Sequence, residues 1–146
     1  MRILLMIVIS LMSNVGLAQE EKISIEVSGI DAERGGNLIV LVFGSDGFPV
    51  KHEKAFLTQT TKVSGERMSF AFNVPAPSYT EMAFKVLHDQ DANNKVTKNW
   101  TGIWPAEGLG FSNGAKMRAV GPPGFDDAKL SRDQAMSGVK VRLIYP

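Results

Sequence analysis

A run of acidic and amide residues between Asp89 and Asn99 carries the residue types best suited to binding a metal ion. Asp89, Asp91 and Asn93 place side-chain oxygens at the first, third and fifth positions, the spacing with which calcium loops surround a hard cation. Asn94 follows at the sixth position, where such loops turn sharply, and asparagine tolerates the left-handed conformation better than most residues. The candidate calcium ligands are Asp89, Asp91, Asn93, Lys95 through its carbonyl, Thr97 and Asn99.

The twelfth position of this loop departs from the calcium pattern. A bidentate acidic ligand is expected there, whereas this chain has Trp100. Glu107 is the next carboxylate along the chain, but nothing in the spacing requires it to take that place. The alternative is a turn rich in Asp and Asn whose side chains hydrogen-bond their own backbone and need no metal. Both interpretations stay open, and Ca²⁺ is the one cofactor that the sequence suggests, at the weak affinity typical of extracellular modules.

Two further patterns offer catalytic chemistry. His88 stands beside Asp89, which could orient the imidazole as a general base, but His88 shares its strand face with Phe84 and Val86, which favours a place at the edge of the core. Residues 110–114 fit the spacing of a nucleophile elbow around Ser112, yet both histidines precede that serine, so we interpret the segment as a turn.

The other histidine, His52, lies among charged residues and is expected to be solvated. With no cysteine in the chain, thiol catalysis and thiolate metal sites are excluded.

Aromatic residues gather in the long segment that follows Asp89. Trp100 and Trp104 stand among prolines there, and exposed aromatic side chains on a stiffened loop can bind a partner. The residues predicted for this binding surface are His88, Trp100, Trp104, Glu107, Phe111, Ser112 and Asn113. The alternative is a satellite hydrophobic cluster that fastens the loop to the rest of the fold.

The elements that must position these residues follow a period of two. Alternating stretches predict strands over 22–29, 68–74, 82–88 and 139–145, and a polar strand over 58–63. The unbroken apolar run 38–43 predicts a strand covered on both faces, and 53–55 could form a helical turn. From 89 to 127 the chain is predicted to be one long irregular loop. These patterns predict an all-β antiparallel β-sandwich, with a small β-barrel as the alternative.

The amino terminus predicts export. A single positive charge at Arg2, an apolar run over 3–12 and small residues up to Ala18 form a signal peptide over 1–18, cleaved near Ala18-Gln19. The remaining 19–146 forms one domain, expected in the periplasm or outside the cell. Without Arg2 it holds 15 basic and 15 acidic residues, so it has no broad electrostatic attraction to nucleic acid or anionic membranes. The apolar run is too short to span a bilayer, so no membrane span is expected in the mature protein.

Four motifs of the second half of the chain stand out together: His88-Asp89-x-Asp91-x-Asn93-Asn94-Lys95, Asn99-x-x-Gly102, Pro105-x-Glu107-Gly108-x-Gly110-Phe111-Ser112-Asn113 and Pro122-Pro123-x-Phe125-x-x-Ala128. Through these motifs the chain resembles the bacterial family called domain of unknown function 2141. Members commonly carry Gly where this chain has Asn94, Asp where it has Thr97, and often Tyr at Leu109, and the first two departures weaken the calcium interpretation. The run 72–79 also resembles the strand-turn-strand of transthyretin-like sandwiches, though those usually have Gly at Ser78. Fold analogy of this kind carries no function.

Together these features predict a non-catalytic binding or accessory module of the cell envelope, with the 89–113 loop as its working surface. Its partner would be an envelope protein, a peptide or a glycan. A calcium-stabilised structural domain and a small envelope enzyme using His88 with Asp89 are the two alternatives.

Overall fold

A computed structural model describes residues 16, 20–75, 79–99, 101–102 and 104–146. The predicted signal peptide, Gly16 apart, lies outside the described residues, and so does Trp100. None of the helices in the described part of the chain is long and apolar enough to cross a membrane.

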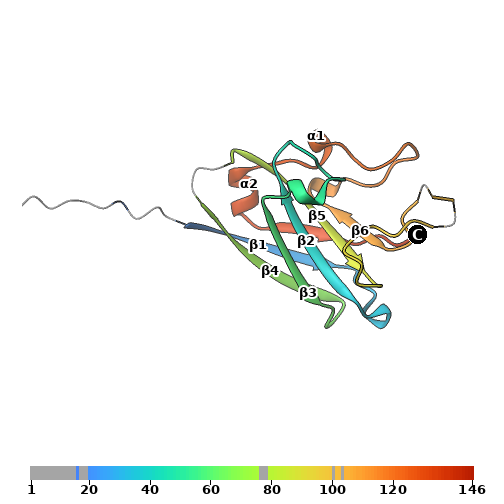
Figure 1. The fold of residues 1–146 in the computed structure, drawn as a ribbon. Coiled ribbons are helices and arrows are strands. Elements are labelled where there is room, and N and C mark those ends of the chain that lie inside the picture. The colour runs from blue at the N-terminus through green and yellow to red at the C-terminus, as the bar shows by residue number, and fades with distance from the viewer. Residues whose placement is uncertain (1–15, 17–19, 76–78, 100, 103) are drawn as a thin grey trace, which may run out of the picture.

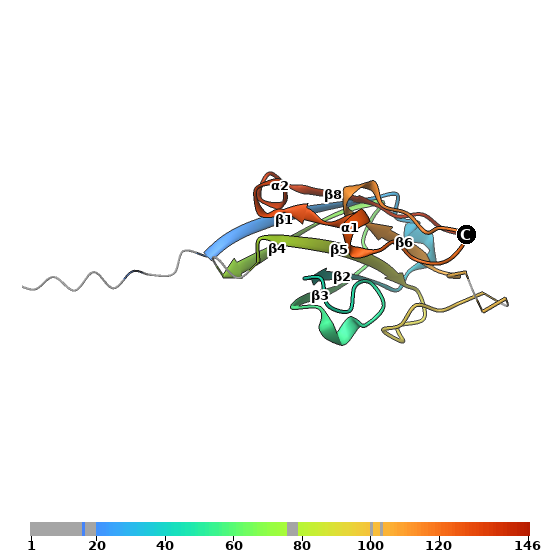
Figure 2. The same cartoon turned by 90° about the horizontal axis from the view of Figure 1, so that it is seen from above.

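The described strands form two sheets that pack as layers, so the predicted β-sandwich is confirmed (Figures 1 and 2). One sheet has the order β4-β1-β8, from β4 (Arg67–Pro75), β1 (Glu20–Ser28) and β8 (Val139–Arg142). The other has the order β3-β2-β5-β6, from β3 (Leu57–Lys62), β2 (Asn37–Phe43), β5 (Glu81–Asp89) and β6 (Gly108–Phe111), and β7 (Leu130–Ser131) pairs with β5. All pairs are antiparallel except β1 with β8, which run parallel.

Short helices connect these strands. They are the 3-10 turns η1 (Ala32–Arg34), η2 (His52–Lys54) and η3 (Ser112–Gly114), and the α-helices α1 (Phe125–Ala128) and α2 (Arg132–Met136). The helical turn predicted within 53–55 corresponds to η2. Helices this short are not stable alone, and α1 and α2 are each held to the sheets by one buried alanine, Ala128 and Ala135.

The main core lies between the two sheets, where the period-two pattern places it. In β1, Ile23, Ile25 and Val27 are buried while the residues between them are exposed or half-buried. Ile23 pairs with Phe72 and Ile25 with Phe70 of β4, which are buried on the same face. The alternating stretches therefore fix the side of each sheet that faces its partner.

A second core covers the outer face of the five-stranded sheet. Ile39, Leu41 and Phe43 of β2 are buried there with Leu87 of β5, and loop residues such as Phe48 pack on them. The prediction that β2 is covered on both faces is confirmed, since every residue from Leu38 to Phe43 is buried. The stretch 82–88 was predicted only as an alternating strand, but β5 is likewise buried from its second residue onward.

The prediction of one irregular segment from 89 to 127 is wrong in two places, because β6 and α1 interrupt it. The glycines that suggested a loop have a packing role in β6. A Cβ on Gly110 would lie 2.6 Å from a methyl carbon of Val141 and 2.7 Å from the carbonyl oxygen of Arg142. Glycine at this position lets β6 approach the other sheet closely.

Candidate functional site

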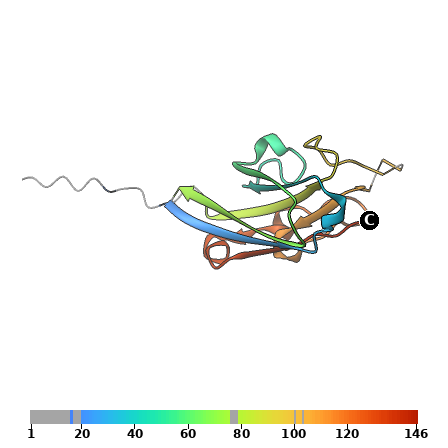
Figure 3. The ribbon, with the colours of Figure 1, turned by 90° about the horizontal axis from the view of Figure 1, so that it is seen from below.

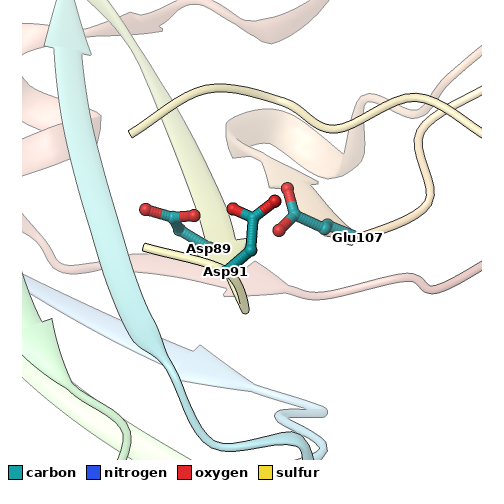
Figure 4. A group of neighbouring side chains, drawn as sticks. All are labelled: Asp89, Asp91 and Glu107. Carbon is teal, nitrogen blue, oxygen red and sulfur yellow. The ribbon is translucent and has the colours of Figure 1, made fainter. Parts of the chain in front are cut away.

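Three carboxylates meet where β5 ends and β6 begins. Asp89 closes β5, Asp91 lies two residues beyond it, and Glu107 directly precedes β6. Because β5 and β6 are antiparallel neighbours, the end of one strand lies beside the start of the other. One carboxylate oxygen from each residue lies within 4.8 Å of the others. Figure 4 shows the three side chains beside one another. The sequence predicted that Asp89 and Asp91 lie close together. The pairing of β5 with β6 brings Glu107 beside them.

Two of these carboxylates fix the course of the loop. Asp89 is fully buried and accepts hydrogen bonds from the backbone N–H groups of Asn93 at 3.1 Å and Asn94 at 2.8 Å. Glu107, also buried, accepts from the backbone N–H groups of Gln90 at 2.9 Å and Thr97 at 3.0 Å. Charge-assisted hydrogen bonds of this kind are about twice as strong as neutral ones. The loop is therefore clamped at both ends.

Asp91 is exposed and bonded within the loop. Its carboxylate accepts from the side chain of Asn93 and from the hydroxyl of Thr97, both at 2.9 Å. Partial desolvation raises the pKa of Asp91, but the hydrogen bonds from Thr97 and Asn93 outweigh it, and the net pKa is lowered. Asp91 is thus held ionised beside the two buried carboxylates.

The other predicted calcium ligands differ in where their side-chain oxygens point. The Asn93 amide turns its nitrogen toward Asp91 while its oxygen accepts from the backbone N–H of Lys95. The Asn99 oxygen accepts from the backbone and hydroxyl of Thr101. Side-chain oxygens of Asp89, Asp91 and Thr97 therefore gather with Glu107, whereas the oxygens of Asn93 and Asn99 point to other partners. Asn94 has the predicted left-handed conformation, with φ of 60°, and Ala92 adopts it as well.

The cluster fits a hard cation in donor type. All its candidate ligands are oxygens, which Ca²⁺ prefers. An ionised carboxylate has about four acceptor positions, so the backbone bonds to Asp89 and Glu107 leave lone pairs for a cation. The same geometry serves as a metal-free clamp, because each carboxylate already has N–H or O–H donors.

A pocket of about 540 Å³ lies against the same loop. Its floor is Lys85 of β5 with Leu109 and Phe111 of β6, on the outer face of the five-stranded sheet. One wall is the loop that carries η2, and the opposite wall is residues 94–98; Figure 3 shows these two loops on the same side of the sandwich. The volume is within the range of small-molecule sites.

Lys85 is the central polar group of this floor. Its side chain is buried, and Nζ donates to the carbonyl oxygen of Pro49 at 2.9 Å and lies 2.8 Å from Nε2 of His52. Burial lowers the pKa of Lys85 to about 8. A charged amine inside an apolar site is disfavoured unless it is paired, and none of the ion pairs formed by the described residues includes Lys85.

His52 joins the floor of the pocket to the loop. An ammonium has donors only, so when Lys85 is protonated Nε2 of His52 is the acceptor. Desolvation lowers the pKa of His52, the charge of Lys85 adds to this effect, and a hydrogen bond with the backbone of Asn94 opposes it. The expectation that His52 is solvated is met only in part, because the residue is half-buried and its ring contacts Nζ of Lys85.

One protein-family model matches most of the chain. Residues 25–139, from β1 to the start of β8, match the family described as an uncharacterised protein conserved in bacteria, DUF2141. The chain belongs to the DUF2141 family. Searches of curated proteins and of solved structures found no match. The function of this DUF2141 protein must therefore be argued from its own residues.

Several residues predicted for the binding surface of this DUF2141 protein are buried, which corrects that prediction. His88 is completely buried, Nδ1 bonds the hydroxyl of Tyr145 and Nε2 bonds the carbonyl of Gly35, each at 2.6 Å. Neither ring nitrogen contacts Asp89, because neighbouring residues of a strand point to opposite faces. The geometry thus does not pair the His88 imidazole with Asp89, as the hypothetical enzyme would require.

Ser112, also buried, accepts from the backbone of Phe84 and donates to the carbonyl of Ala128. It fastens the turn after β6 to the sheet. Phe111 is buried but lines the pocket, while Trp104 and Asn113 are exposed as predicted. Glu107, buried as well, faces the loop.

Lys85 was not predicted as a site residue of this DUF2141 protein, although one feature of the sequence indicated it. It stands between Ala83 and Leu87 on one strand face, and a lone lysine among apolar residues on such a face indicates a buried cation.

Proposed function

We propose that this protein is an exported, non-catalytic binding module of the cell envelope that takes a small ligand into the pocket above Lys85. The observation that carries the proposal is a pocket of about 540 Å³ with a largely apolar lining and one buried amine at its floor. Apolar pockets with a few converging polar groups and a residue of perturbed pKa are the usual form of a ligand site.

The walls support binding because they are fixed before a ligand arrives. Asp89 and Glu107 clamp the loop that supplies one wall, and His52 ties that wall to the floor. A preorganised site spends less of its binding free energy on ordering side chains and loops. The pocket also borders the 89–113 segment, which the sequence predicts as the working surface, and the export proposal rests on the signal-peptide pattern of 1–18.

Chemical-shift mapping of ¹⁵N-labelled protein against a library of small soluble compounds tests the pocket. We expect shifts to gather on Val50, Val96 and Leu109 and to spare the β4-β1-β8 sheet. The Met117→Trp variant, which places a large ring in the pocket, is expected to lose these shifts. Val120→Trp is the matched control, because Val120 is 92% exposed and is not among the lining residues. Shifts that ignore the pocket, or that survive in the Met117→Trp variant, would remove this function.

A calcium-stabilised structural domain is the second candidate, favoured by the oxygens of Asp89, Asp91 and Glu107 within 4.8 Å of one another. A cation that binds only the native state raises the melting midpoint. We expect a higher midpoint in millimolar calcium than in chelator, and a smaller difference in the Asp91→Asn variant. An unchanged midpoint in the wild type would eliminate calcium.

A further inference from the structure

We propose that the pocket binds an organic anion with an apolar body, whose charged group lies against the ammonium of Lys85. This inference rests on the proposed function and adds the chemical class of the ligand. It comes from three properties of the pocket: the charges that line it, the unpaired state of the buried amine, and the apolar character of the remaining lining.

The charges favour an anion. The pocket is lined by three lysines, Lys85, Lys95 and Lys98, and by one carboxylate, that of Glu53. Lys95 and Lys98 are exposed and lie on the loop wall, whereas Lys85 is buried at the floor. Like-signed charges around a concave site concentrate ligands of the opposite sign.

The buried amine gives the anion a definite position. An ammonium has three donors, and two partners are identified for Lys85 among the described residues, the carbonyl of Pro49 and the ring of His52. Both partners are neutral acceptors when the ammonium donates to them. Breaking or omitting the partner of a buried charge is costly, and an entering carboxylate or sulfonate would supply it. A cationic ligand would add to the repulsion, and a neutral ligand would leave the charge unpaired.

The rest of the lining suits an apolar body. Val50, Val96, Leu109, Phe111 and Met117 line the pocket together with three prolines. Each buried methylene of a ligand contributes about 0.8 kcal/mol by its removal from water. The charged group would therefore set the orientation of the ligand, and the body would supply much of its affinity.

Calorimetric titration with three eight-carbon-chain compounds tests the charge of the ligand. The probes share an eight-carbon chain and differ in charge: octanoate, octanol and octyltrimethylammonium, whose head group adds three methyls. Anilinonaphthalene sulfonate serves as an anion of different shape. We expect both anions to bind the wild-type protein, octanol to bind at least about tenfold more weakly than octanoate, and the cation not to bind. Chemical-shift mapping of the same titrations locates each bound probe.

Three variants test whether the preference for an anion depends on the amine of Lys85. Lys85→Met removes the charge and keeps most of the side-chain volume, so octanoate and octanol are expected to bind it equally. Lys140→Met is the matched control, since Lys140 is exposed on β8, in the other sheet, and its loss should change neither affinity. Lys85→Arg keeps the charge and should keep the preference for octanoate if it folds as the wild type does.

The outcomes separate this inference from the proposed function. Equal binding of octanol and octanoate by the wild type, or an undiminished preference in Lys85→Met, overturns the anion while leaving the pocket as a ligand site. Failure of both anions to bind also overturns the anion, and the library experiment decides the pocket independently. If neither anion binds and no library compound maps to the pocket, the proposed function itself is overturned.

Discussion

Nζ of Lys85 lies 2.8 Å from Nε2 of His52, and the same imidazole bonds the backbone of Asn94. The N–H of Asn94 in turn donates to the buried carboxylate of Asp89. A short series of polar contacts thus connects the carboxylate cluster at the end of β5 to the amine at the floor of the pocket. A substitution at Asp89 is therefore expected to affect the surroundings of Lys85, and a substitution at Lys85 those of Asp89.

The buried amine makes stability depend on pH. Burial lowers the folded-state pKa of Lys85 from 10.5 to about 8, so between these values the unfolded state binds more protons than the folded state. Stability therefore rises with pH across this window, and the cost of burying the ammonium is fully present below pH 8. Relative to Lys85→Met, the wild type should gain about 3 kcal/mol between pH 7.5 and 10.5.

Urea unfolding of the two proteins at a series of pH values measures this difference. The comparison also cancels other groups, such as Tyr145, whose pKa is raised by burial. Parallel stability curves for wild type and Lys85→Met would contradict the assignment of a lowered pKa to Lys85.

Asp89 is predicted to matter more to the loop than Asp91. Asp89→Asn removes the charge that accepts two backbone N–H groups in a buried place, which should cost about 1–3 kcal/mol. Asp91→Asn, the matched control on an exposed neighbour, should cost less. Hydrogen exchange of the Asn94 amide should speed up strongly in the first variant, and octanoate affinity should fall with it. Equal effects of both substitutions would contradict the role of Asp89 as a clamp.

The sequence predicts those parts of the fold that depend on one strand at a time. The alternation in β1 and β4 identifies their buried faces, and the position of Asp91 two residues after Asp89 brings the pair together because both lie on one turn. Glu107 could not be placed in advance, since its position depends on the pairing of β6 with β5. That pairing was hidden because the glycines of β6 are typical of loops.

Lys85 was missed for a related physical reason. The sequence shows which residues share a strand face but not whether a distant loop covers that face. Here the loop carrying η2 and the residues after β6 cover the outer face of the sheet, and they create the second core and the pocket together. The left-handed conformation of Asn94 was predictable because it is a local property of the chain.

Gly110 is predicted to be the glycine of β6 least tolerant of a side chain between the sheets. In Gly110→Ala the new Cβ would meet Val141 and the backbone of Arg142 at under 3.0 Å, and backbone cannot move aside cheaply. The expected loss is at least about 2 kcal/mol by denaturant unfolding. Gly65→Ala is the control, because its Cβ would meet nothing nearer than 3.8 Å. A Gly110→Ala protein as stable as Gly65→Ala would mean that β6 is not held against β8.

Anion binding should weaken as the amine loses its proton. With a pKa of about 8 in the free protein, Lys85 is mostly charged at pH 7 and mostly neutral at pH 9. A bound anion stabilises the ammonium and raises its pKa, so binding near pH 8 takes up a proton. Octanoate affinity should therefore fall about tenfold from pH 7 to pH 9, which calorimetry measures directly. In Lys85→Arg the guanidinium stays charged over this range, so its affinity should be constant, and in Lys85→Met it should be weak and constant. A tenfold fall that persists in Lys85→Arg would place the titrating group elsewhere in the pocket, and a wild-type affinity that does not change with pH would separate the anion from Lys85.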